Sequence, residues 1–140
     1  MEFNFNNSLL EVLKSLGVKN SKIDLAYLYP ATKIRYYAKM KRLAGSDNEE
    51  QAMIEDVLET LAELEKKGVP HMEFIARLNK ILNDLEKQLM ANGGHFMVGH
   101  NMSIADIGVY VVLDQMSDRT RAMYPHLKVL YESIDISLYF

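Results

Sequence analysis

The sequence predicts an all-α protein, a single bundle of helices. Glycine and proline are sparse, seven and three in 140 residues, so few positions interrupt the chain. Between them, apolar residues recur at three- and four-residue steps, which is the spacing of one face of a helix. No segment shows the sustained two-residue alternation that predicts strands. A chain of this length forms one ordinary domain.

The first half of the chain predicts three helices. Residues 8–16 can form a short one, and residues 31–43 a second of mixed basic and aromatic character. Asp47 is placed to cap a third helix, with Glu49 and Glu50 in the first turn, where carboxylates favour the helix dipole. The apolar stripe of this third helix consists of Ile54, Val57, Leu58, Leu61 and Leu64.

The second half contains the clearest helix, predicted over 71–91, and a central one after it. The apolar stripe of the first consists of Phe74, Ile75, Leu78, Ile81, Leu82, Leu85 and Leu89, and Gly93 should end it. Ser103 and Asp106 have the spacing of a capping box, in which each side chain accepts a backbone N–H left free by the first turn. Residues 107–113 are apolar on every face, so the helix that follows should be buried all round.

Composition narrows the classes of function. A hydrophobic fraction of 49% and a net charge of −3 are typical of a globular protein without bulk attraction to nucleic acid or acidic lipid. The chain has no cysteine, which removes disulfides, thiolate metal sites and a cysteine nucleophile. Residues 1–20 have no sustained apolar core, so we expect neither a secretory signal nor a membrane anchor. We therefore expect a cytoplasmic protein that does not bind membranes.

Several motifs follow one another from about residue 31 onward. They are Ile-Arg-Tyr-Tyr-Ala-Lys at 34–39 running into Leu-Ala-Gly at 43–45, Asn-Glu-Glu-Gln-Ala at 48–52, Phe-Met-Val-Gly at 96–99 with Ser-Ile-Ala-Asp at 103–106, and Tyr-Pro-His-Leu-Lys at 124–128. In this order they resemble the C-terminal helical domain of glutathione S-transferases, the sigma and mu classes most closely. The resemblance implies a helical bundle of that type over residues 29–140, preceded by an atypical segment, residues 1–28, with a short helix.

The departures from the family bear on activity. In the family a thioredoxin-like domain precedes these helices, carries the activating Tyr, Ser or Cys, and binds glutathione. Only about 30 residues precede the matching region here, too few for a sheet packed by crossover helices. The Gln/Glu-Ser pair with which the family holds the glutamyl carboxylate aligns with Tyr29-Pro30, and proline offers no donor. Glu63 aligns with an acidic residue that, in some classes, contacts the glutathione bound to the other protomer of the dimer. The resemblance therefore implies a cross-dimer glutathione contact at Glu63.

Charged residues predict an interaction face. Glu55, Glu59 and Glu63 are spaced four apart and form an acidic row, in which like charges repel by about 0.2–0.5 kcal/mol per pair. The basic residues that could lie opposite, within the protomer or across a twofold axis, are Lys33, Arg35, Lys39, Lys41 and Arg42. A solvated surface is the other interpretation of both. The basic cluster with Tyr36 and Tyr37 also has the ingredients of a nucleic-acid patch, but the negative net charge makes nucleic acid an unlikely partner.

The remaining candidates are aromatic or imidazole side chains. Tyr27, Tyr29, Tyr36 and Tyr37 could line a hydrophobic cleft like the family's second-substrate site, with core packing as the alternative. The histidines are His71, His95, His100 and His126. No converging ligand or nucleophile is placed beside them, so we expect loop histidines, no metal site and no catalytic residue.

The segment 1–28 should cover the flank that the family buries against its thioredoxin-like domain. Its apolar residues are Phe3, Phe5, Leu9, Leu10, Leu13 and Leu16.

These points favour a non-catalytic interaction or assembly module without a cofactor. Such solitary domains resemble scaffold subunits of multi-synthetase complexes and the transferase-like appendages of elongation factors, which pair with like domains through helix faces. The expected partner is a similar helical domain or a second copy of the chain. The alternative is a divergent or truncated sigma-like glutathione transferase that relies on another chain for its glutathione site. A hydrophobic-ligand carrier that uses the tyrosine cleft is a third hypothesis.

Overall fold

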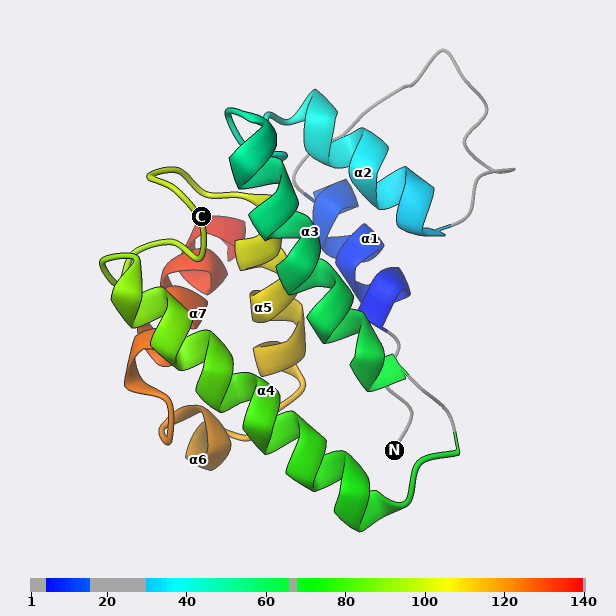
Figure 1. Ribbon diagram of the computed structural model, residues 1–140, viewed down its shortest axis with the longest axis vertical. Helices are drawn as coiled ribbons and strands as arrows, with labels where there is room; N and C mark the ends of the chain where they lie inside the picture. Colours follow the sequence, from blue (N-terminus) through cyan, green and yellow to red (C-terminus); the bar gives the residue numbers. More distant parts are fainter. Residues whose placement is uncertain (1–4, 16–29, 66–67, 140) are drawn as a thin grey trace.

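The computed structural model describes residues 5–15, 30–65 and 68–139, and over these ranges the protein is all-α, which confirms the predicted fold class. Its elements are α1 (Phe5–Ser15), α2 (Pro30–Met40), α3 (Asn48–Ala62), the 3-10 turn η2 (Glu63–Glu65), α4 (His71–Ala91), α5 (Ile104–Asp114), α6 (Asp118–Arg121) and α7 (Pro125–Tyr139). Helix α5 lies in the middle of the bundle, with α1 and α3 on one side and α7 on the other (Figure 1). Helix α4 packs against α7.

The boundaries of α3 and α4 agree with the sequence patterns. The Asp47 side chain accepts the backbone N–H of Glu50 at 2.8 Å and caps α3. Helix α4 covers His71–Ala91, as predicted. Helix α1 begins already at Phe5, ahead of the predicted start.

Helix α2 ends at Met40, earlier than the sequence predicts. The N–H of Leu43 donates to the carbonyl of Ala38 at 2.7 Å, and the N–H of Arg42 donates to that of Lys39 at 3.2 Å. Arg42 adopts a left-handed backbone with φ of 58°. These contacts form a Schellman turn, which stops the helix and buries Leu43.

The core is organised around α5, where every residue from Ile104 to Leu113 is buried, as predicted. Gly108 lets two helices approach it closely. A Cβ there would lie 3.2 Å from Cδ2 of Leu58 on α3 and 3.3 Å from Cζ of Phe5 on α1. A larger residue would therefore push α1 or α3 away.

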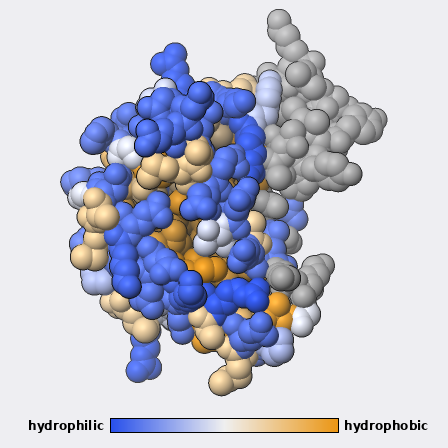
Figure 2. Space-filling view, viewed as in Figure 1, coloured by the Kyte–Doolittle hydropathy of each residue, from blue (hydrophilic) through white to orange (hydrophobic). Residues whose placement is uncertain are grey.

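Helix α1 covers a face of α5 and α2 with Phe5, Leu9, Leu10 and Leu13, all buried. These four residues are therefore part of the core, whereas Phe3 and Leu16 lie outside the described residues. That α1 covers the flank which the family buries against its thioredoxin-like domain stays a prediction. The face seen in Figure 2 is mostly hydrophilic, with apolar atoms in its middle between α3 and α4. Among the described residues, no helix is long and apolar enough to cross a membrane.

Candidate functional sites

The turn before α5 is held by the carboxylate of Asp106. Its Oδ2 accepts the N–H of Ser103 at 2.8 Å, and its Oδ1 accepts the N–H of Met97 at 2.7 Å. Ser103 Oγ in turn accepts the N–H of Ala105 at 3.3 Å, so the two side chains form a capping box. Burial raises the pKa of the Asp106 carboxyl to about 6, although the N–H groups of Met97 and Ser103 act in the opposite direction. The position of Asp106 makes it a structural carboxylate rather than a surface acid.

Helices α2 and α3 are joined by a two-point ion pair. Arg35 Nε donates to Oε1 of Glu55 at 3.0 Å, and Arg35 Nη2 donates to Oε2 at 2.6 Å. This bidentate geometry is the strong form of the arginine–carboxylate contact. For Glu55, the opposing basic residue therefore lies within the protomer.

The rest of the acidic row is directed elsewhere. Glu59 is exposed on α3, and Glu63 is exposed in η2, just after the helix ends. With Ala62 and Glu65 they line a shallow hollow of about 500 Å³. The predicted row is therefore divided into one internally paired residue and two that face solvent. Of the predicted basic residues, Lys33 is half-buried and Lys39 is exposed.

Tyr36 and Tyr37 are half-buried on α2 and contact each other edge to face, with ring centroids 6.1 Å apart. Tyr37 packs against the core. Tyr27 and Tyr29, the other members of the predicted cleft, lie outside the described residues.

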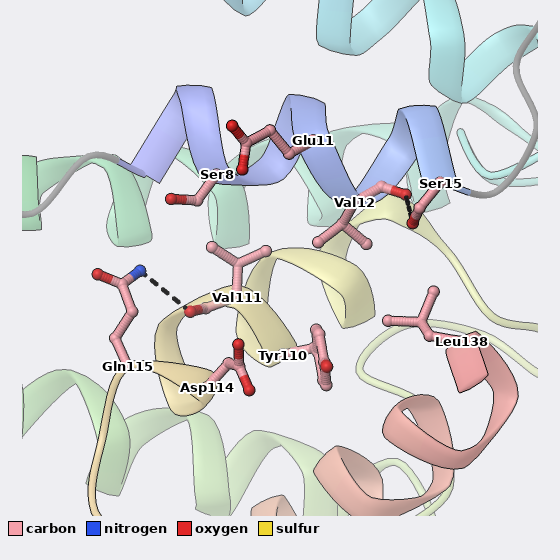
Figure 3. A pocket seen from close by; sticks show the side chains of 9 residues that line it. All are labelled: Ser8, Glu11, Val12, Ser15, Tyr110, Val111, Asp114, Gln115 and Leu138. Atoms are coloured by element: carbon pink, nitrogen blue, oxygen red, sulfur yellow. Dashed lines mark hydrogen bonds between the residues drawn. The ribbon is translucent and has the colours of Figure 1, made fainter.

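A hollow that sequence reasoning missed lies between α1, α5 and the end of α7 (Figure 3). Its volume is about 320 Å³. Its walls are Ser8, Glu11, Val12 and Ser15 from α1, Tyr110, Val111, Asp114 and Gln115 from α5, and Leu138 from α7. Two of its polar side chains bond to their own helices, since Ser15 donates to the carbonyl of Val12 and Gln115 to that of Val111.

A pair of stacked tyrosines lies beside this hollow, with ring centroids 5.1 Å apart. The Tyr110 hydroxyl donates to Asp135 and the Tyr131 hydroxyl to Asp114, at 2.7 and 2.8 Å. Burial, followed by the hydrogen bond to Asp114, raises the pKa of Tyr131 to about 12, and burial with the bond to Asp135 raises that of Tyr110 further. Both hydroxyls are therefore protonated donors at neutral pH and hold α5 to α7.

Arg121 closes the end of α5. Its Nη1 donates to the carbonyls of Leu113 and Met116 at 2.8 and 2.6 Å, and its guanidinium lies 4.4 Å from the centre of the Tyr131 ring. The sequence could have indicated this role, because Arg121 is a cation shortly after the apolar run of α5, and cations bind the free carbonyls at helix ends.

Two of the histidines expected in loops lie in helices, and one of them, His71, begins the helix that was predicted over 71–91. His71 and His126 lie in the first turns of α4 and α7 rather than in loops, because each follows a proline that favours the start of a helix. His126 Nδ1 is 2.9 Å from Oε1 of Glu86. In the part of the chain that the structure describes, no three histidine or acidic side chains come together in a way that could hold a metal ion.

Most of the helices described above fall within a match to one known protein family. A family model for the glutathione S-transferase C-terminal domain matches residues 53–136, which run from within α3 into α7. No curated protein matches the chain. Helices α1 and α2 lie outside the matched region.

Proposed function

Because the chain belongs to the glutathione S-transferase C-terminal domain family, we propose that it is a non-catalytic interaction module that pairs with a like helical domain. The observation that carries the proposal is the acidic surface along α3 and η2. Its exposed acids are Glu49, Asp56, Glu59 and Glu63. Glu59 and Glu63 are exposed and form no ion pair within the described ranges.

An apolar side chain lies among the acids of this surface. Met53 is 43% exposed among these acids, and Ala52 beside it is exposed and small. An apolar centre with a charged rim is typical of interfaces between proteins, and the rim charges select a partner of opposite sign. A basic helix face on a similar domain fits this description.

The simplest such partner is a second copy of the chain. Lys39, at the end of α2, and Lys41, just after it, are exposed and opposite in sign to the acidic surface. In a twofold dimer each acidic face would meet the basic face of the other protomer. Association with a translation assembly, of the synthetase-complex or elongation-factor type, is the heterotypic form of the same proposal.

The mass in solution tests this proposal. We expect a dimer by light scattering at low salt, dissociated by Glu59→Lys with Glu63→Lys and retained by the charge-matched control Asp84→Lys with Glu132→Lys. A chain carrying Lys39→Glu and Lys41→Glu should also be monomeric, and mixing it with the acidic-face variant should restore the dimer. A monomer at every concentration, or equal behaviour of the acidic-face and control variants, would remove the homotypic form.

The second candidate is glutathione conjugation by a divergent sigma-like transferase, with another chain supplying the glutathione site. The exposure of Glu63 at the end of α3 favours it, since a residue lent across a dimer must be accessible. Calorimetry with glutathione separates the two functions. For the interaction module we expect no heat of binding with glutathione. Glutathione binding in the millimolar range or tighter, lost in Glu63→Gln, would favour the transferase.

A further inference from the structure

A groove lies where α2 and the loop after it meet α3 and the turn before α5. It consists of two hollows of about 170 and 470 Å³, which share Lys39, Ala44 and Gln51 in their walls. The smaller, which we call the apolar hollow, has walls of Ile34, Ala38, Ile54, Leu58 and Ile104. The larger, which we call the polar hollow after its charged residues, is lined by Arg42, Asn101 and Ser103 and by the apolar Val98 and Met102, in addition to the shared residues.

The charges in the groove leave an excess of positive charge in the polar hollow. Arg35 and Glu55 also line the apolar hollow, but they bind each other at two points. The acid in the polar hollow is Glu50, and its Oε1 already accepts the N–H of Ser46 at 3.1 Å. Lys39 and Arg42 are exposed and form no ion pair with the part of the chain that the structure describes.

Arg42 occupies a backbone position that favours glycine. Its φ of 58° is that of the residue after a helix in a Schellman turn, where a side chain is strained and glycine is usual. Lys39 and Lys41 already supply cations at this end of α2, so the helix dipole does not require a third. Arg42 thus lines the larger hollow from a strained backbone position that glycine would occupy at lower cost.

We propose that the groove binds a small amphipathic carboxylate, a linear aliphatic acid. Its carboxylate meets the guanidinium of Arg42 and the ammonium of Lys39, and its chain lies in the apolar hollow. An arginine fork matches the two oxygens of a carboxylate, and apolar walls with few polar groups are the usual make-up of a ligand site. This site lies apart from the acidic surface of α3 but shares Lys39 with the basic face of the proposed dimer. Arg42 belongs to the site alone, so Arg42→Gly tests the groove separately from the dimer.

Calorimetry of the full chain with octanoate tests the proposal. We expect saturable binding with Kd on the order of 1 mM or tighter, weakened about tenfold or more by Arg42→Gly, because a charge-assisted hydrogen-bond pair is lost. Arg42→Gly relieves backbone strain, so its Tm should equal or exceed that of the parent chain, which excludes unfolding as the cause. Lys87→Ala is the matched control, since it removes an exposed cation that lines neither hollow and lies outside the proposed dimer face, and it should bind octanoate like the parent.

Further probes separate the head from the tail. Acetate, which lacks the chain, and octylammonium, which reverses the charge, should each bind at least about tenfold more weakly than octanoate. Amide NMR shifts caused by octanoate should concentrate at Ala44 and Gln51, where the hollows meet. The proposal is overturned if octanoate does not bind, if Arg42→Gly binds it as tightly as the parent, if octylammonium binds equally well, or if the shifts lie elsewhere.

Discussion

Glu86 on α4 holds the first turn of α7 through His126. Its Oε1 accepts the backbone N–H of His126 at 2.5 Å and lies 2.9 Å from Nδ1 of the ring, and its Oε2 is 3.4 Å from the N–H of Leu127. Helix α7 begins at Pro125, so these N–H groups lack partners within the helix. A carboxylate from another helix thus serves as the N-terminal cap of α7, where negative charge also favours the helix dipole.

Removal of this cap should loosen the contact between α4 and α7. We expect Glu86→Ala to lower the free energy of unfolding by about 1–3 kcal/mol, because it leaves backbone donors without an acceptor. Urea unfolding measures the change. Asp84→Ala, at an exposed position of the same helix, is the control and should stay within about 0.5 kcal/mol of the parent. Equal losses in the two variants would contradict the capping role.

Because of Asp106, the free energy of unfolding should decrease as the pH rises, which is opposite to the usual effect of a carboxyl group in a folded protein. The pKa of Asp106 is raised from an ordinary value of about 4 to about 6 by burial, so the folded chain binds this proton more strongly than the unfolded chain does. The stabilising contribution is therefore full below pH about 4 and is lost as the pH rises through about 6. This shift in the pKa of Asp106 corresponds to about 3 kcal/mol in the free energy of unfolding.

The measurement is urea unfolding from pH 4 to 7 for the parent and Asp106→Asn. We expect the stability advantage of the parent to shrink by up to about 3 kcal/mol between pH 4 and 6, because only the parent titrates at this position. A parallel pH profile for the parent and Asp106→Asn would show that burial does not shift this group.

The elements that the sequence predicted well are those determined by local contacts. The Asp47 cap, the stripe of α4 and the Ser103–Asp106 box all involve residues within one or two turns of each other. The role of Glu86 could not be predicted, because its partner His126 is 40 residues away in the chain. On sequence grounds Glu86 is an ordinary polar residue between the apolar positions of a helix.

The candidate sites were less predictable for the same reason. A spacing of four residues places Glu55, Glu59 and Glu63 near one another. It cannot show that Arg35 of α2 binds Glu55, while Glu59 and Glu63 are exposed. The end of α2 was also set by a left-handed Arg42, and sequence rules expect glycine or asparagine there. The groove between α2 and α3 depends on both of these features.

Helix α1 should be an integral part of the core rather than an appendage. Leu9 is fully buried against the bundle, so Leu9→Ala should lower the free energy of unfolding by about 2–5 kcal/mol. Chemical unfolding followed by circular dichroism measures this loss. Met72→Ala, at a side chain that is 82% exposed, is the control and should change stability by less than about 0.5 kcal/mol. A small effect of Leu9→Ala would show that α1 contributes little to the fold.

The Arg35–Glu55 pair should contribute more than the other surface ion pairs, because it is bidentate and joins two helices. Its side chains are 36% and 42% exposed, so solvent screening limits the coupling to about 0.5–1 kcal/mol. A double-mutant cycle with Arg35→Ala and Glu55→Ala, read by urea unfolding, isolates this value. The same cycle on Lys80 and Asp84, an exposed pair within α4, should give about 0.3–0.5 kcal/mol. A coupling for Arg35–Glu55 no larger than this would mean that the pair joins α2 to α3 no more strongly than an exposed pair within one helix is held together.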